Sequence, residues 1–287
     1  MKRNHLIVFI TVLIISIACG YWITKTDRYN NYRELQFLES VVKNTLHQNG
    51  YAVELNSEYN ILGYEMSVVG DGGFSQKSDD SVLYMTYLMK LNGKGVSPMT
   101  AELTQYIDLN SKINYININH GQWFKEISNG SLTIFQKIPK LFKKSKFKNS
   151  DDWIEIIDDR DQDQIVELRL PLSDADFLTK QLISNVLNIS NDINLDQLIQ
   201  KAKSVNYKIT INKQEQQITQ MDVSYSNGIQ ELIRNLARDY PNLFLQLPSE
   251  EVEAMYFNLS VNLLNSNEII QIPTEVKNKA ISISDLK

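Results

Sequence analysis

The amino-acid sequence predicts an α+β fold in which one curved antiparallel β-sheet packs against several helices. Three observations predict this class. Apolar residues recur at helical spacing after the N-terminal segment, the period then changes to two along most of the chain, and short turn signals separate the resulting strands. Strands joined by such short links run antiparallel, because parallel neighbours need long crossover connections.

Residues 1–23 predict a signal peptide or a membrane anchor. Lys2 and Arg3 precede the uncharged apolar run 6–23. The basic end of such a segment stays in the cytoplasm, so the pattern predicts that the rest of the chain lies on the extracytoplasmic face of the cell membrane. Cys19, the only cysteine, follows the small residue Ala18, as in a lipoprotein processing site whose thiol receives a lipid.

Three kinds of tether stay open. A lipid on Cys19 would anchor the mature chain through burial of its acyl groups, although Ser16 stands where a bacterial lipobox favours Leu. An uncut helix over the 18 residues 6–23 would span about 27 Å, which is close to the hydrocarbon thickness of a bilayer. Cleavage and release is the third alternative, and no clear small-x-small site supports it.

The composition limits the partners of the exported part. Removing Lys2 and Arg3 from the 29 basic and 34 acidic residues of the chain leaves this part with a net charge of −7. Such a balance argues against nucleic acid as a partner, since nucleic-acid binding needs a basic surface. With 43% hydrophobic residues, the chain has the composition of a folded protein. The lack of cysteine beyond Cys19 excludes disulfides and thiol chemistry from the body.

The first half of the body is predicted as one helix and a run of strands. Leu35, Leu38 and Val42 recur at helical steps within 27–48, and Gly50 stops that helix. Strands follow at Tyr51–Asn60, Tyr64–Val69, Val82–Leu91, Met99–Leu109, Lys112–Ile118 and Gln122–Ile127. The glycines over 70–73 predict a hairpin turn. Both faces of Val82–Leu91 are apolar, so we expect this strand to be covered on both sides.

A charged insertion is predicted at about 137–163, where six lysines over 137–148 are followed by seven acidic residues over 151–163. Further strands are predicted at Ile165–Leu170, Asn206–Lys213, Gln217–Tyr225 and Met255–Leu263, with helices at Asp174–Leu187, Leu195–Val205 and Ile229–Tyr240. The strand at Met255–Leu263 is the clearest, because apolar and polar residues alternate there without exception. About 260 residues beyond the N-terminal segment suffice for one large domain or two small ones.

Several motifs follow one another in a family-like order. They are Tyr106-Ile107, Tyr115-Ile116, Gly121-Gln122-Trp123-Phe124-Lys125, the stretch Gly72–Lys77 between two strands, Tyr207–Lys213 and Ile270–Lys277. Behind an export signal and a helix, this order resembles the LolA/LppX-like bacterial lipoproteins, in particular their Gram-positive surface members. The resemblance covers most of 27–287. It implies an open half-barrel with helices on its concave face and lipid or lipopeptide between the sheet and the helices.

No catalytic, cofactor or metal motif is found. The three histidines stand far apart, and the sequence contains no HExxH pair, no Gly-x-Ser-x-Gly elbow and no phosphate-binding glycine loop. Asp159, Asp161 and Asp163 alternate as in a calcium loop, but Gln164 and Leu170 stand where that loop needs Gly and Glu. We therefore expect a protein without enzymatic activity or cofactor.

Two sets of residues are candidates for binding. An aromatic and apolar set is a candidate lining for a ligand, with sheet packing as the alternative: Tyr84, Leu88, Tyr106, Tyr115 and Trp123. A basic set is a candidate contact with an anionic membrane or a cell-wall polymer, with a solvated loop as the alternative: Lys140, Lys143, Lys144 and Lys146.

These features together predict a membrane-anchored extracytoplasmic bacterial protein, a lipoprotein, that binds a hydrophobic ligand between sheet and helices. The alternative is a non-enzymatic interaction module of the cell envelope with no small-molecule ligand.

Overall fold

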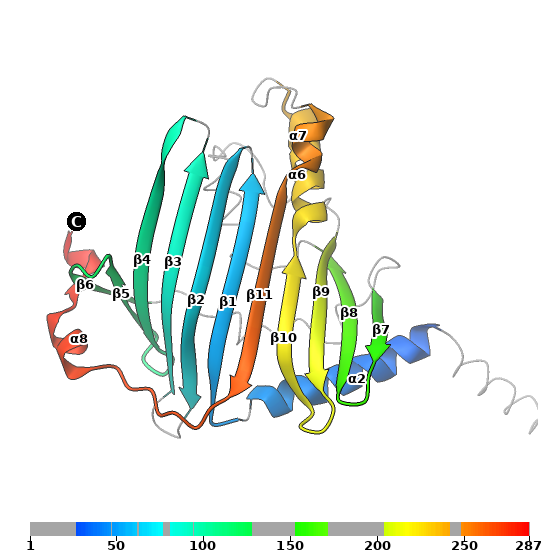
Figure 1. Ribbon diagram of the computed structural model, residues 1–287, viewed down its shortest axis with the longest axis horizontal. Coiled ribbons are helices and arrows are strands. Elements are labelled where there is room, and N and C mark those ends of the chain that lie inside the picture. The colour runs from blue at the N-terminus through cyan, green and yellow to red at the C-terminus, as the bar shows by residue number, and fades with distance from the viewer. Residues whose placement is uncertain are drawn as a thin grey trace, which may run out of the picture.

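The fold is dominated by one long, open β-sheet (Figure 1). The computed structural model describes residues 27–46, 48–61, 63–76, 81–93, 95–127, 153–171, 204–241 and 248–286. Within these residues the sheet has 12 strands in the order β12-β6-β5-β4-β3-β2-β1-β11-β10-β9-β8-β7. All neighbours are antiparallel except β12 and β6. The predicted α+β class with an open antiparallel sheet is confirmed.

The strands have the following bounds: β1 Gly50–Ile61, β2 Tyr64–Gln76, β3 Ser81–Gly93, β4 Val96–Asp108, β5 Ile113–Ile118, β6 Trp123–Ile127, β7 Trp153–Asp159, β8 Asp163–Pro171, β9 Ser204–Asn212, β10 Gln217–Ser224, β11 Tyr256–Asn265 and β12 Ile281–Ser282. The described helices are α2 Asp27–Leu46, α6 Ser226–Asp239, α7 Ser249–Glu253 and α8 Thr274–Lys279, followed by a 3-10 turn, η2, at Ile283–Leu286.

The two halves of the chain meet in the middle of the sheet. Strands β1 to β6 form a meander in chain order, and β7 to β10 form a second run beside β11. The pairing of β1 with β11 joins them, with Tyr51 opposite Asn265 and Asn60 opposite Tyr256. This long pairing places residues about 200 positions apart in one continuous sheet.

The two faces of the sheet differ in character. We call the face that contacts α2 and α6 the inner face and the opposite one the outer face. On β1 and β11, Val53 pairs with Leu263 on the inner face, whereas Glu54 pairs with Asn262 on the outer face. Apolar and polar residues alternate along these strands because successive side chains point to opposite sides. Burial of the inner residues supplies the main driving force for the packing of the helices.

The hydrophobic core lies between the inner face of β7–β11 and two helices. Helix α2 contacts β7 and β10, and α6 contacts β9 and β11. Leu38, Leu168, Ile209 and Leu232 come together there, and each is inaccessible to solvent. The Thr45 side chain joins α2 to β10, because its Oγ1 accepts a hydrogen bond from the Ile218 N–H at 3.0 Å within this core.

The C-terminal segment covers the outer face at the other end of the sheet. After β11 the chain crosses the sheet to α8 and then adds β12 beside β6 (Figure 1). Ile272, Val276 and Ala280 form a second apolar cluster with Val82 and Tyr115. The predicted two-sided cover of the strand around Val82–Leu91 is thereby confirmed for its first half.

One local prediction was wrong. The glycines at 70–73 do not form a turn, because β2 runs through them to Gln76. These glycines instead let neighbouring side chains approach the backbone of β2. A Cβ on Gly70, for example, would lie 2.7 Å from the Tyr87 ring. The acidic part of the charged segment contains β7, an edge strand in which Ile154 pairs with Leu168. The helices predicted over 174–187 and 195–205 fall almost wholly outside the described residues.

Candidate functional site

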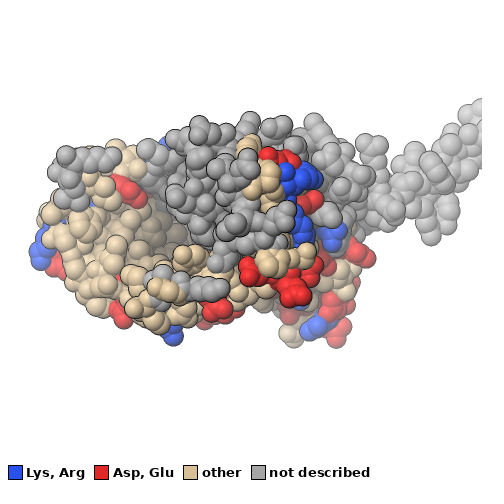
Figure 2. Space-filling view, turned by 90° about the horizontal axis from the view of Figure 1, so that it is seen from above, with Lys and Arg blue, Asp and Glu red and all other residues tan. Residues whose placement is uncertain are grey.

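An apolar surface on the inner face of β2–β6 is the candidate binding site. Cross-strand pairing places its side chains on one face, and we call this set the apolar platform: Met66, Val68, Met85, Tyr87, Met89, Leu91, Met99, Ala101, Leu103, Ile116, Ile118 and Phe124. Unlike the sealed core of β7–β11, most of it is only partly buried, and Met99 and Ile118 are 60% and 48% exposed. Seen from above, the surface at that end of the molecule shows mainly uncharged side chains (Figure 2).

Methionine is concentrated on this platform. Four of the chain's seven methionines lie there, on three adjacent strands. Methionine has an unbranched, polarizable side chain that adapts to irregular apolar partners. The platform therefore presents a surface that can fit an apolar chain without one fixed shape.

A polar row borders the platform on β4–β6. The Gln105 Nε2 donates to Asn114 Oδ1 at 2.8 Å, and the Asn114 Nδ2 donates to Glu126 Oε1 at 3.1 Å. Asn114 is buried, so its two hydrogen bonds offset the cost of removing its amide from water. The row places a carboxylate and two amides next to an apolar surface.

Tyr87 lies inside the platform and packs over Gly70. Burial raises the pKa of its hydroxyl to about 12, because the phenolate form would lose its hydration. The side chain is therefore neutral throughout the physiological pH range and adds to the apolar character of the surface.

The predicted ligand-lining set lies on the other face of the same strands. Tyr84, Tyr106 and Tyr115 stand opposite one another on β3–β5. The ring centroids of Tyr84 and Tyr106 are 4.7 Å apart, and those of Tyr106 and Trp123 are 5.7 Å apart. Leu88 is 38% exposed opposite Glu102.

The structure thus brings the four aromatic residues together on the outer face. The C-terminal segment packs on Tyr106, Tyr115 and Trp123, which agrees with the packing alternative. The platform residues were not among the sequence candidates. Both faces of Val82–Leu91 are apolar, so alternation could not tell which face meets the helices.

The other candidates fall outside the described residues. These are the predicted lipid-attachment residue Cys19 and the basic set Lys140, Lys143, Lys144 and Lys146. Among the helices that the structure describes, none has the length and apolar character of a membrane span. The described part also contains no cluster of His, Cys, Asp and Glu suited to a metal ion.

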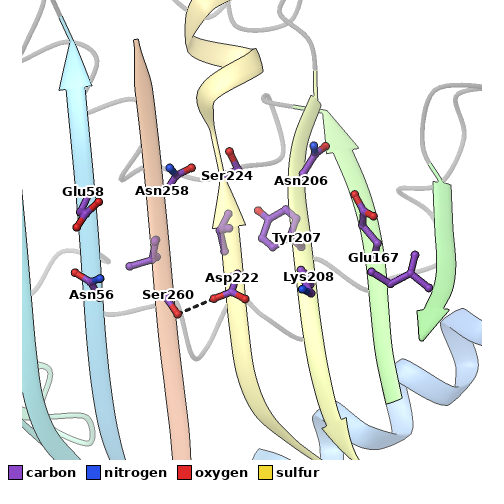
Figure 3. A pocket seen from close by; sticks show the side chains of 13 residues that line it. Asn56, Glu58, Glu167, Asn206, Tyr207, Lys208, Asp222, Ser224, Asn258 and Ser260 are labelled. Atoms are coloured by element: carbon purple, nitrogen blue, oxygen red, sulfur yellow. Dashed lines mark hydrogen bonds between the residues drawn. The ribbon is translucent and has the colours of Figure 1, made fainter. Parts of the chain in front are cut away.

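A polar groove of about 440 Å³ crosses the outer face of β1, β11, β10, β9 and β8 (Figure 3). Asp222 lies at its centre, and its Oδ1 accepts hydrogen bonds from Ser260 Oγ at 2.6 Å and Gln220 Nε2 at 3.0 Å. Lys208 and Glu167 flank it on the neighbouring strands. The described residues of the groove offer hydrogen-bond donors and acceptors to a polar ligand.

Comparison with known proteins finds similarity only among solved structures. No protein-family model and no curated protein matches the chain. LprF from Mycobacterium bovis matches with 12% identity and a TM-score of 0.44, over 84% of this chain and 95% of LprF. The lipoprotein LppX from Mycobacterium tuberculosis matches with 8% identity and a TM-score of 0.33, over 83% of this chain and 97% of LppX.

A beta-barrel-like protein of Brucella abortus matches with 6% identity and a TM-score of 0.26, over 75% of this chain and 95% of that protein. At these identities and TM-scores the likeness carries no argument about function. The neighbours include LppX, which gives its name to the group that the sequence resembles.

Proposed function

We propose that this protein binds the acyl part of a lipid or lipopeptide on the apolar platform, between the inner face of its sheet and its helices. It would do so without enzymatic chemistry, as a component of the bacterial cell envelope. The observation that supports this most directly is the contrast within one face. The core side chains of β7–β11 are sealed, whereas those of β2–β6 keep part of their apolar surface accessible.

The energetics favour an apolar ligand there. Burial of apolar surface contributes about 25 cal/mol per Å², so an acyl chain that covers the platform gains free energy along its whole length. Exposed Met99 and Ile118 would lose contact with water when the ligand binds. The methionines would adjust to the chain, which suits a ligand class with variable acyl groups.

The polar row would hold the other end of such a ligand. Asn114 is fixed by its neighbours Gln105 and Glu126, so its position costs little entropy when a ligand arrives. A head group that carries hydroxyl or amide groups fits these acceptors and donors. An acyl chain on the platform with its polar end at β4–β6 is the arrangement that we propose.

The test is to identify what the protein carries. The chain is expressed in its native host, purified gently, and examined by native mass spectrometry and by organic extraction of the bound fraction. We expect an amphiphile with at least one acyl chain at a stoichiometry near one. Protein that carries none, and that takes up none from added lipid, would contradict the proposal.

We propose further that the chain is tethered to the extracytoplasmic face of the membrane through a lipid on Cys19. The support is sequence alone: a basic start, an apolar run and a small residue before the cysteine. The intact mass of the membrane-extracted protein separates the alternatives. A diacylated Cys19 at the N-terminus supports the tether, whereas a mass that includes the uncut segment 1–23 contradicts it.

A further inference from the structure

A second cavity, of about 570 Å³, lies against α6 and is separate from the apolar platform. One stripe of the helix lines it: Asn227, Gln230, Glu231, Arg234, Asn235 and Arg238. These residues recur at three- and four-residue steps and therefore share one face of the helix. Arg169 of β8 is the other described residue of the lining. Figure 2 shows basic and acidic side chains side by side around α6 and α7.

The charges of this pocket favour an anion. Among the described lining residues, three carry a guanidinium group and one, Glu231, carries a carboxylate. The Arg169 Nε donates to Asn206 Oδ1 at 3.2 Å, and the Arg238 Nε donates to Asp239 Oδ1 at 2.9 Å. Arg234 forms no hydrogen bond or ion pair with the described residues, so its fork of donors is available.

Two further polar groups in the pocket lack partners. Asn235 is only 6% exposed, and its amide makes no hydrogen bond within the described part of the chain. The Glu231 Oε2 is buried and has no hydrogen-bond partner. Buried polar atoms are nearly always satisfied, because each one left unpaired costs stability. The unpaired Glu231 Oε2, with the Asn235 amide and the uncommitted Arg234 guanidinium beside it on the same stripe of α6, suits a ligand that supplies hydrogen-bond partners.

The pocket is held ready by contacts outside it. The Gln230 Nε2 donates to the carbonyl oxygens of Glu253 and Met255, at 3.1 and 2.9 Å. The opposite stripe of α6 is sealed against the sheet, with Leu232 and Leu236 inaccessible to solvent. Because the helix is fixed in rotation, the positions of Glu231, Arg234 and Asn235 are fixed as well.

We propose that this pocket binds a zwitterionic phosphate group of the phosphoethanolamine type. Arg234, with Arg169 and Arg238 beside it, donates to the phosphate oxygens, since the planar guanidinium matches phosphate geometry. The ammonium group donates to the Glu231 carboxylate. The Asn235 amide bonds the phosphate or the ammonium with its donor and acceptor atoms.

Three soluble probes test the chemistry by isothermal titration of the full-length protein. We expect O-phosphoethanolamine to bind more tightly than inorganic phosphate, which lacks the ammonium. It should also bind more tightly than phosphocholine, whose quaternary nitrogen has no N–H to donate. Equal affinity for phosphoethanolamine and phosphocholine would overturn the role of Glu231. No affinity for any probe, soluble or in vesicles, would overturn the site.

The source of the group is separated by a vesicle assay. Vesicles of phosphatidylethanolamine in phosphatidylcholine are compared with phosphatidylcholine alone. Binding to the soluble phosphoester supports a free ligand. Binding only to phosphatidylethanolamine vesicles, lost in Arg234→Gln, supports the same chemistry on a lipid head group.

Variants connect binding to the named side chains. Arg234→Gln should weaken phosphoethanolamine binding by about tenfold or more, the usual effect of losing a charge-assisted hydrogen bond. Lys90→Gln, at an exposed position of β3, removes the same charge and should leave the affinity unchanged. Glu231→Gln should remove the preference for phosphoethanolamine over phosphocholine.

Asn235→Leu separates a ligand role from a structural one. If the amide serves a ligand, its replacement by an apolar side chain of similar size should weaken binding and leave the melting temperature unchanged. A lower melting temperature with unchanged affinity would show that Asn235 is structural and would contradict the proposal.

Discussion

Ile270 lies directly over Gly73: a Cβ on Gly73 would come 2.7 Å from the Ile270 Cδ1. The Ser75 side chain strengthens this contact, because its Oγ donates to the Ile270 carbonyl and accepts from the Ile270 N–H, both at 3.2 Å. The absence of a side chain at Gly73 thus gives the C-terminal segment its place on the outer face of the sheet.

Filling this place should loosen the segment. We expect Gly73→Val to lower the free energy of unfolding by about 2 kcal/mol, as is usual for overpacking at a close contact. Ile270→Ala removes the atom that clashes, so the double variant should recover about half of that loss. Urea unfolding of the four proteins in the cycle measures the coupling. Strict additivity would show that Ile270 does not cause the cost.

Removing the Thr45 hydroxyl should lower the free energy of unfolding. In Thr45→Val the buried Ile218 N–H loses its acceptor while the shape of the side chain is kept. We expect a loss of about 1–3 kcal/mol in the free energy of unfolding. Thr86→Val is the matched control, because Thr86 Oγ1 donates to the Asp71 carbonyl at an exposed position and should cost less than about 0.5 kcal/mol. Equal losses of unfolding free energy in Thr45→Val and Thr86→Val would contradict a stabilising role for the Thr45–Ile218 hydrogen bond.

Tyr87 should make stability depend on alkaline pH. Its pKa in the folded protein is about 12 because of burial, against 10.0 for the exposed side chain. A raised folded pKa means that the stabilising contribution is complete below pH 10 and is lost as the pH rises toward 12. The loss is up to about 3 kcal/mol, since one pKa unit corresponds to 1.36 kcal/mol.

Tyr87→Phe provides the comparison for that titration. The variant lacks the ionising group, so its free energy of unfolding should fall less steeply between pH 10 and 12 than that of the unchanged protein. Chemical denaturation at intervals of half a pH unit measures the difference. Parallel curves would show that the Tyr87 hydroxyl is not protected in the fold.

The fold was predictable where one face of a strand is polar. In Met255–Leu263 the alternation is strict, and β11 buries Leu259, Val261 and Leu263 as expected. It was not predictable where both faces are apolar, as on β3. There the cover on the outer face of Val82 comes from Ile272 and its neighbours, about 190 positions away, and alternation along one strand cannot indicate contacts at that distance.

The same limit applies to the candidate sites. Tyr84, Tyr106 and Trp123 lie together in the structure, and the sequence did not assign them to a face of the sheet. The run Gly70–Gly73 resembled a turn because glycine is common in turns, yet here it leaves room for Tyr87 and Ile270 within a strand. The partnerless groups of α6 depend on tertiary surroundings, so no spacing rule could have identified them.

Substitutions at two adjacent residues of β3 test whether a hydrophobic ligand binds the inner face of β2–β6. Met89 lies on the inner face and Leu88 on the outer face of the same strand. Met89→Asp places a charge on the platform, whereas Leu88→Asp places it at an exposed outer position. Met99→Asp is included because Met99 is 60% exposed on the inner face, so a charge there should not unfold the protein.

The most direct measurement is the dissociation constant of a fluorescent fatty acid for these three variants, each with its melting temperature determined. Met89→Asp and Met99→Asp should weaken the affinity for the fatty acid by about tenfold or more, because burying a charge against an acyl chain costs free energy. The dissociation constant of Leu88→Asp should stay within about twofold of that of the unchanged protein. Loss of binding in Leu88→Asp alone, or unchanged binding in both inner-face variants, would contradict the account.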